Sequence, residues 1–163
     1  MSTPSETTPT KKPGRFDPPV WRFNEDPMPN VSQTGGCHCG AVRFRVQHPV
    51  LTKQPGFHFP VKMCNCSICA HNGYLLIYPE RYELEWISGE EVLVDYRFAT
   101  EKKAHRFCGR CGSSICMDPQ GSWSSWAGDV VGLNRLTQVR MLDEWDIADL
   151  NFHEKDGKNF IPK

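Results

Sequence analysis

The chain has 163 residues, 39% of them hydrophobic, and a formal net charge of zero at pH 7. A chain of this length can form one domain with a sizeable core. Basic and acidic residues are balanced at 19 each, which gives no broad attraction to nucleic acid or to an anionic membrane. The N-terminus has no apolar signal segment, and the longest apolar run, at residues 74–78, is too short to span a bilayer. We therefore expect a soluble, cytoplasmic protein that binds neither nucleic acid nor membrane.

The first thirty residues differ in composition from the rest of the chain. They contain seven of the 13 prolines, many Ser and Thr, and no apolar periodicity. Such a segment does not bury enough apolar surface to offset the entropy of ordering it. We therefore predict a disordered or loosely packed arm over residues 1–30 and one β domain over residues 31–163.

The body of the chain consists of short segments typical of β-strands, separated by turn residues. Strands are expected over residues 41–46, 74–79, 82–89, 91–98, 103–108, 112–118 and 126–136. The three segments between residues 74 and 98 are expected to form a meander, because short turns join them. Only residues 145–150 (WDIADL) favour a helix, and a short one. The predicted fold class is mainly β, with small antiparallel sheets and few short helices.

Eight cysteines need an explanation in a protein expected in a reducing compartment. Disulfides rarely persist there, so metal binding is the better hypothesis. The cysteines fall into a C-H-C piece at 37–39, a C-x-C-x2-C piece at 64–69, a C-G-R-C piece at 108–111, and Cys116. Cys116 lies in an alternating segment and is expected to be a small buried apolar residue rather than a ligand.

The spacing divides the other seven cysteines into two candidate zinc sites. A Cys pair followed by glycine can direct two thiolates to one metal, and two such pairs complete a tetrahedral four-cysteine site. The two pairs are Cys37 with Cys39 and Cys108 with Cys111. The remaining triplet has three thiolates and one vacant position, as in catalytic zinc sites, and consists of Cys64, Cys66 and Cys69. His71 could complete the triplet as a fourth ligand, which would make it a structural site.

The cysteine motifs and their order are similar to those of a known family. The chain resembles the glutathione-dependent formaldehyde-activating enzyme family, also called the centromere protein V family, in G-G-C-H-C-G-A-V-R-F, C-N-C-S-I-C, Y-L-L-I-Y-P and F-C-G-R-C-G-S-S-I, spread over residues 35–135. The resemblance implies a β-tent, a small arrangement of β-sheets pinned by zinc. It also implies two zinc ions per chain, a structural one on Cys37, Cys39, Cys108 and Cys111 and a catalytic one on Cys64, Cys66 and Cys69. The family's basic residue soon after the triplet is replaced here by Ala70, His71 and Asn72.

The same resemblance implies a zinc-dependent carbon–sulfur lyase, similar to S-(hydroxymethyl)glutathione synthase. Its substrates would be glutathione and formaldehyde, or a related small electrophile, and the substrate thiol would lose its proton at the triplet zinc. His71 or Tyr74, both close in sequence, could act as proton donor. Three alternatives remain open: a lyase acting on a different small molecule, a zinc-pinned protein-interaction module without catalysis, and a thiol-redox or metal-buffer protein.

Overall fold

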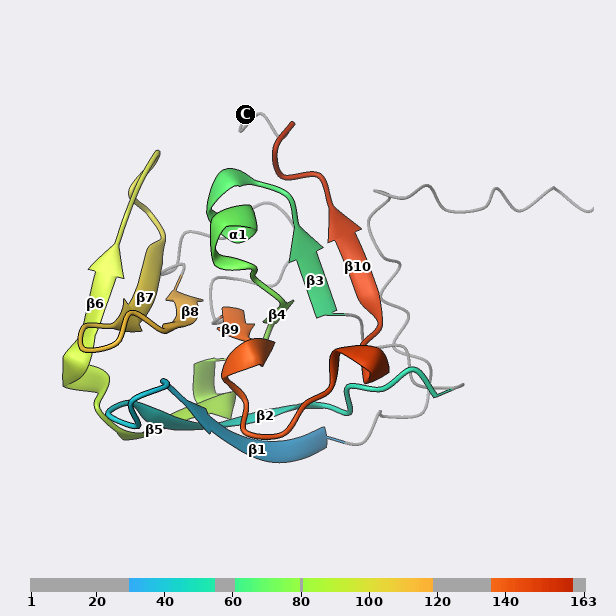
Figure 1. Cartoon of the computed structure of the whole chain (residues 1–163), viewed down its shortest axis with the longest axis horizontal. Helices are drawn as coiled ribbons and strands as arrows, with labels where there is room; N and C mark the ends of the chain where they lie inside the picture. The colour runs from blue at the N-terminus through green and yellow to red at the C-terminus, as the bar shows by residue number, and fades with distance from the viewer. Residues whose placement is uncertain (1–29, 55–60, 80, 119–135, 160–163) are drawn as a thin grey trace, which may run out of the picture.

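The strands form two sheets in the computed structural model, which describes residues 30–54, 61–79, 81–118 and 136–159 (Figure 1). The smaller sheet has the order β1-β2-β5, with β1 at Asn30–Gly36, β2 at Arg43–Pro49 and β5 at Leu84–Ser88. The larger sheet has the order β10-β3-β4-β9-β8-β7-β6. Its strands are β3 at Val61–Cys64, β4 at Leu76–Ile77, β6 at Leu93–Tyr96, β7 at Ala104–Cys108, β8 at Ser114–Asp118, β9 at Leu136–Gln138 and β10 at Phe152–Lys155.

The helices of the described residues are few and short, as the sequence predicts. One α-helix, α1, covers Ser67–Asn72, and the single-turn 3-10 helices are η1 at Arg81–Glu83, η2 at Glu90–Val92, η3 at Val139–Met141 and η4 at Ile147–Asp149. None of these helices is long or apolar enough to cross a membrane. The predicted class, mainly β with small sheets, is confirmed.

The strand pairing corrects one prediction, the meander over residues 74–98. The first segment contributes β4 to the larger sheet, the second contributes β5 to the smaller sheet, and the third returns to the larger sheet as β6. β5 is not part of the larger sheet because it pairs with β2. There the Phe44 and Trp86 rings pack edge to face, with their centroids 6.1 Å apart. Such a distant partner is not visible in local turn signals. One pairing is also parallel, between β10 and β3.

Other predicted elements have mixed outcomes. The segments at 103–108 and 112–118 form β7 and β8, an antiparallel pair joined by the C-G-R-C-G turn, as predicted. The helix expected at 145–150 is only the single 3-10 turn η4, which the Asp146 carboxylate caps by accepting a hydrogen bond from the Ala148 N–H at 2.8 Å. α1 was not predicted. The strand expected at 126–136 lies outside the described residues except for Leu136, which begins β9, and the arm expected at 1–30 does so except for Asn30.

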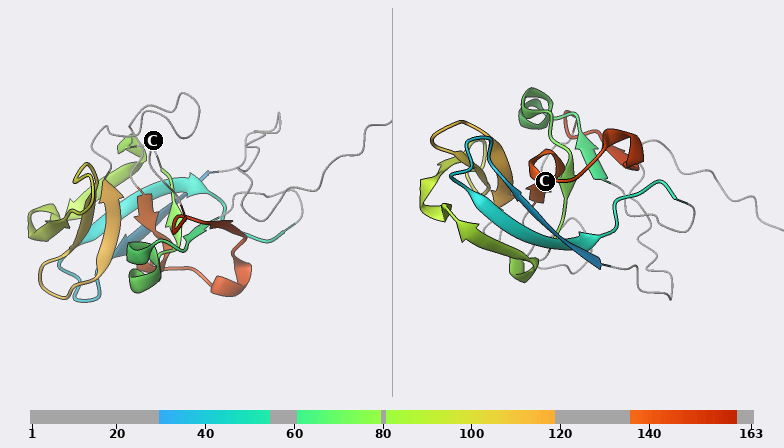
Figure 2. Two further views of the ribbon diagram at one scale, coloured as in Figure 1. Left: turned by 90° about the horizontal axis from the view of Figure 1, so that it is seen from above. Right: turned by 60° about the horizontal axis from the view of Figure 1, so that its bottom comes forward.

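The main core lies between the two sheets, with the smaller sheet lying across the larger one (Figures 1 and 2). The side chains of residues 74–78 alternate between this core and a second, smaller one. Leu75 and Ile77 belong to the main core, whereas Tyr74, Leu76 and Tyr78 pack in a smaller cluster with the triplet. Successive side chains of an extended segment point to opposite faces, so this short run holds the triplet and α1 on the far side of the larger sheet from the main core.

Candidate metal centres

The four cysteines predicted to share one zinc lie together between two turns. The sulfur atoms of Cys37, Cys39, Cys108 and Cys111 are all within 4.8 Å of one another. The Cys37 and Cys39 sulfurs are 3.5 Å apart, and the Cys39 and Cys108 sulfurs are 3.8 Å apart. Sulfurs at about 2.3 Å from a tetrahedral Zn²⁺ are about 3.8 Å from one another. The donor set and its spacing therefore fit a four-cysteine zinc site.

Each of the two turns of this group is closed by a backbone hydrogen bond from a glycine. The Gly40 N–H donates to the Cys37 carbonyl at 3.1 Å, and the Gly112 N–H donates to the Cys108 carbonyl at 2.8 Å. Both glycines have φ of 75°, a left-handed conformation that side chains rarely adopt. The Val42 N–H also donates to the Cys37 sulfur at 3.2 Å. Each C-x1–2-C-G piece is thus a local turn that presents two sulfurs to the same point.

Ser113 joins the two turns. Its hydroxyl accepts a hydrogen bond from the His38 N–H at 3.1 Å and lies 3.3 Å from the Cys111 sulfur. Hydrogen bonds from the Ser113 side chain and backbone lower the pKa of Cys111 to about 5. A lowered pKa favours the thiolate, which is the form that binds a metal.

The triplet lies where β3 runs into α1. Cys64 ends β3, Cys66 is the N-cap of α1, and Cys69 lies within the helix. Their sulfurs are within 4.8 Å of one another, Cys69 is 8% exposed, and the other two are half-buried. α1 ends at Gly73, where the chain turns toward Tyr74. The end of β3 and the first turn of α1 therefore bring three sulfurs to one point.

Cys64 and Cys69 have opposite pKa shifts. Hydrogen bonding with the Cys69 thiol lowers the pKa of Cys64 to about 5 although burial opposes the shift, and the Cys66 N–H, 3.5 Å from the Cys64 sulfur, lowers it further. The pKa of Cys69 is raised, because its proton is held in the bond to Cys64 and because the thiol is buried. A cation at the centre would displace the Cys69 proton, since thiolates are the ligand form. The triplet thus fits Zn²⁺ with three protein ligands.

His71 does not join the triplet. It is exposed on α1, and its Nδ1 is 2.7 Å from the Ser67 carbonyl oxygen. Among the described residues, the metal-compatible group at this place contains the three cysteines alone. The reading with three ligands is therefore favoured over a closed fourth position within the described part of the chain.

The C-terminal segment packs against the triplet, a feature that the sequence analysis missed. The Asn65 side chain donates to the Asp156 carboxylate at 2.8 Å and accepts from the Lys158 N–H at 2.9 Å. A Cβ on Gly157 would lie 2.5 Å from the Cys64 sulfur. Only glycine fits there without displacing a ligand. The parallel pairing of β10 with β3 creates this contact, across about ninety residues of sequence.

Three lysines place positive charge beside the triplet: Lys62 in β3, Lys103 just before β7, and Lys155 at the end of β10. Burial lowers the pKa of each, to about 8 for Lys155, while the negative charge of triplet sulfurs opposes the shift. Three thiolates on a divalent cation carry a net charge of −1, which these ammonium groups offset. Lys103 and Lys155 are far from the triplet in the sequence, and Lys62, two residues before Cys64, belongs to no recognisable motif.

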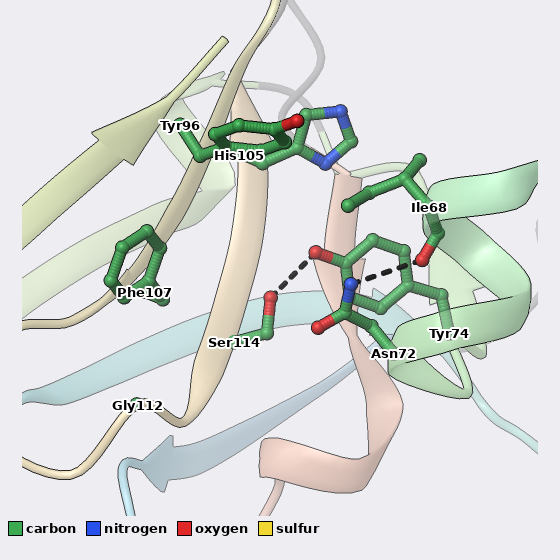
Figure 3. A pocket seen from close by; sticks show the side chains of 8 residues that line it. All are labelled: Ile68, Asn72, Tyr74, Tyr96, His105, Phe107, Gly112 and Ser114. Atoms are coloured by element: carbon green, nitrogen blue, oxygen red, sulfur yellow. Dashed lines mark hydrogen bonds between the residues drawn. The ribbon is translucent and has the colours of Figure 1, made fainter. Parts of the chain in front are cut away.

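A pocket of about 250 Å³ lies beside α1 and faces β7 and β8 (Figure 3). Its lining includes Ile68, Asn72, Tyr74, His105, Phe107 and Ser114. The Tyr74 hydroxyl is hydrogen-bonded to the Ser114 hydroxyl at 2.6 Å. The candidate proton donor Tyr74 thus reaches a pocket, whereas the other candidate, His71, is bonded to its own helix.

All seven predicted ligands come together in the two predicted groups. Cys116 lies in β8, 2% exposed within the main core and outside both groups, as expected for an apolar residue. All eight cysteines are free of disulfides.

Three comparisons relate the chain to known proteins. The sequence model of the family described as glutathione-dependent formaldehyde-activating enzyme matches residues 32–134, more than half of the chain. A curated relative from Halomonas elongata, named "Putative glutathione-dependent formaldehyde-activating enzyme", is 33% identical over 95 residues, which cover 53% of this chain and 56% of that protein. The matched region thus spans little more than half the length of this relative.

A solved structure supports the fold. The crystal structure of a Rhodobacter sphaeroides protein matches with a TM-score of 0.55 and 23% identity, covering 75% of this chain and 98% of that one. The two proteins share a fold. Together with the cysteine groups and the family match, this leads to one conclusion: the chain belongs to the glutathione-dependent formaldehyde-activating enzyme family.

Proposed function

We propose that the protein is a zinc-dependent carbon–sulfur lyase that adds a thiol, with glutathione as the leading candidate, to formaldehyde or a related small electrophile. The observation that carries the proposal is the triplet, three cysteine sulfurs within 4.8 Å with no fourth ligand among the described residues. In this proposal Cys64, Cys66 and Cys69 hold the catalytic zinc, and Cys37, Cys39, Cys108 and Cys111 hold a structural zinc. We infer a cytoplasmic location, where glutathione is available and thiols stay reduced.

The donor set determines the chemistry that the triplet can support. When bound by three thiolates, Zn²⁺ supplies a position for a soft fourth ligand such as a substrate thiol and favours its deprotonation. The net reaction joins the thiol sulfur to the carbonyl carbon and transfers the thiol proton to the carbonyl oxygen. The product is an S-hydroxymethyl adduct, and no oxidant or reductant is required.

The chain's own residues supply charge and a proton. The ammonium groups of Lys62, Lys103 and Lys155 lie near the triplet sulfurs and would favour an anionic thiol such as glutathione, whose net charge at neutral pH is −1. Burial raises the pKa of Tyr74, so its hydroxyl keeps its proton at neutral pH. Its hydroxyl lies 2.6 Å from that of Ser114, and when Ser114 is the donor in this bond the Tyr74 proton is free to be given to the carbonyl oxygen.

The test is a titration of reduced glutathione into protein of known zinc content, followed by calorimetry and by zinc-edge X-ray absorption. The proposal predicts saturable binding and a fourth sulfur at one of two zinc ions, and a formaldehyde-consumption assay then measures turnover. Cys66→Ser should abolish both the saturable binding of glutathione and the signal of a fourth sulfur at zinc. Cys116→Ala, which removes a cysteine outside both groups, should retain them.

Two results would count against the proposal. If two zinc ions are present and glutathione neither binds nor changes the spectrum, glutathione is not the substrate. If the triplet zinc is also inert to other small thiols, a protein-interaction module is the better reading.

A further inference from the structure

We propose that the pocket beside α1 binds the peptide body of the thiol substrate through uncharged hydrogen-bonding groups, with His105 as the residue that recognises an amide. This rests on the proposed function, in which the substrate sulfur lies at the triplet. The inference adds a second subsite to that function and names His105 as the residue of this chain that recognises the peptide part of the substrate.

The pocket is next to the triplet. Ile68 lines the pocket and lies between Cys66 and Cys69 on α1. Tyr74 also lines the pocket, and it packs in the same buried cluster as Cys69. The side chains of Ile68 and Tyr74 therefore lie between the pocket and the triplet. This placement suits a substrate whose sulfur is a few bonds away from the part that the pocket holds.

His105 has an unused hydrogen-bonding atom at this place. Its side chain lines the pocket and is only 6% exposed, and its Nδ1 is buried with no hydrogen-bond partner among the described residues. Buried polar atoms are almost always paired, so an unpaired one inside a pocket points to a ligand group. The strand β7 fixes the position of this imidazole, since His105 pairs there with Met117 of β8 and Tyr96 of β6.

Aromatic contacts also fix the orientation of the His105 ring. The Tyr74 ring lies parallel to it, with an interplanar angle of 5° and a centroid separation of 6.0 Å. The Phe98 ring approaches it with a centroid separation of 5.4 Å. Figure 3 shows the imidazole at the edge of the pocket, near Tyr96 and Ile68. A ring held in this way is a pre-organised hydrogen-bonding group.

The polar groups of the pocket suit an amide. Burial lowers the pKa of His105 to about 4, so at neutral pH the ring has one donor nitrogen and one acceptor nitrogen. The Tyr74 and Ser114 hydroxyls form a second polar group, and the Asn72 amide nitrogen donates to the Ile68 carbonyl at 3.0 Å, which leaves the Asn72 oxygen as an acceptor (Figure 3).

The charge and size of the pocket restrict the ligand further. Its described lining has no charged side chain, so a carboxylate there would lose hydration without an ion-pair partner in the lining. An amide, which both donates and accepts, needs none. The volume of about 250 Å³ is below the range of about 300–1,000 Å³ that is usual for pockets enclosing a whole drug-sized ligand. The pocket therefore fits part of a peptide, such as one peptide unit of glutathione.

The experiment uses zinc-loaded protein and S-methylglutathione, which keeps the peptide but has no free thiol. His105→Phe retains an aromatic ring and removes both nitrogens. We expect the Kd of S-methylglutathione, measured by calorimetry, to rise at least tenfold in this variant. The matched control is Tyr82→Phe, at an aromatic residue that is 81% exposed and outside the pocket, where the Kd should stay within twofold.

A second ligand separates the pocket from the triplet. β-Mercaptoethanol has a thiol and no peptide, so its effect on the absorption of the Co²⁺-substituted protein should be the same in wild type and His105→Phe. If His105→Phe does not fold, Asn72→Ala replaces it, because Asn72 is exposed at the end of α1 and its loss should raise the Kd about fivefold.

The outcomes distinguish the inference from the proposed function. The pocket assignment is overturned if S-methylglutathione does not bind to wild type, or binds equally well to wild type and the pocket variant. If glutathione changes the cobalt spectrum in that case, the proposed function stands without it. If S-methylglutathione binds in a way that depends on His105 while no thiol reaches the metal, the pocket stands and the proposed function fails.

Discussion

Replacing one cysteine in each group should have opposite consequences for folding. Cys108 is fully buried at the end of β7, and its group joins a turn at residues 37–40 to one at 108–112. Structural zinc binding contributes on the order of 10 kcal/mol to small domains, and total stabilities are about 5–15 kcal/mol. Cys108→Ser removes a buried ligand and places a hydroxyl in the main core, so we expect an unfolded or aggregated protein.

Cys66→Ser should leave the fold intact. Cys66 is half-buried, on the far side of the larger sheet from the main core, and it is the N-cap of α1 without a side-chain capping bond. Serine is among the preferred N-cap residues, and a good cap contributes about 1 kcal/mol. This gain partly offsets the lost ligand. We therefore expect a folded protein with one zinc ion instead of two and no lyase activity.

The assay is urea unfolding monitored by circular dichroism, with zinc content measured on the same samples. Cys116→Ala is the control, because it removes a buried cysteine that belongs to neither group. Equal unfolding of Cys66→Ser and Cys108→Ser would refute the reasoning, since it would make both groups structural. A folded Cys108→Ser protein that retains two zinc ions would refute the assignment of the four-cysteine group.

Three further predictions concern the surroundings of these groups. Gly157→Ala places a methyl group 2.5 Å from the Cys64 sulfur, so a chelator should remove the triplet zinc at least tenfold faster than from wild type. A zinc indicator measures this rate, and an unchanged rate would contradict the close packing. Arg81 forms two hydrogen bonds to the Asp118 carboxylate, whose side chain is 7% exposed. Arg81→Ala should lower the free energy of unfolding by about 2 kcal/mol. This loss is smaller than for a fully buried ion pair, because the Arg81 side chain is 37% exposed. Because burial lowers the pKa of His105 to about 4 from 6.5, the unfolded chain binds more protons between these values, and stability should fall as the pH drops. Between pH 7 and pH 5 this loss is about 2 kcal/mol, and urea unfolding should find it reduced in His105→Phe by that amount.

The cysteine groups could be predicted from sequence because each half-site is local. A C-x1–2-C-G turn closes on its own backbone, as the Gly40 and Gly112 hydrogen bonds demonstrate, and the triplet spans only six residues, from the end of a strand to the first turn of a helix. The hairpin of β7 and β8 was predictable for the same reason, since its turn is the second of these pieces. The mainly β class followed from short alternating segments.

The division of the strands between the two sheets, and the residues that surround the triplet, could not be predicted in this way. β5 leaves the expected meander because its partner is β2, forty residues earlier, and the helix expected at 145–150 shortens to one turn. Gly157, Lys155 and Lys103 approach the triplet only because β10 pairs in parallel with β3 and β7 lies in the same sheet. Nothing in the sequence near these residues signals a metal.

The sequence by itself determined which cysteines come together, their division into four and three, and the family to which the chain belongs, because those features are carried by short motifs whose backbone geometry is local. The tertiary structure alone decided what surrounds the triplet. Strand pairing between distant segments brings the charges of Lys103 and Lys155 and a close-packed glycine to the triplet. It also places in the adjacent pocket a His105 nitrogen that has no partner within the described part of the chain. Long-range pairing depends on burial and side-chain complementarity across whole sheets, which local residue patterns do not encode.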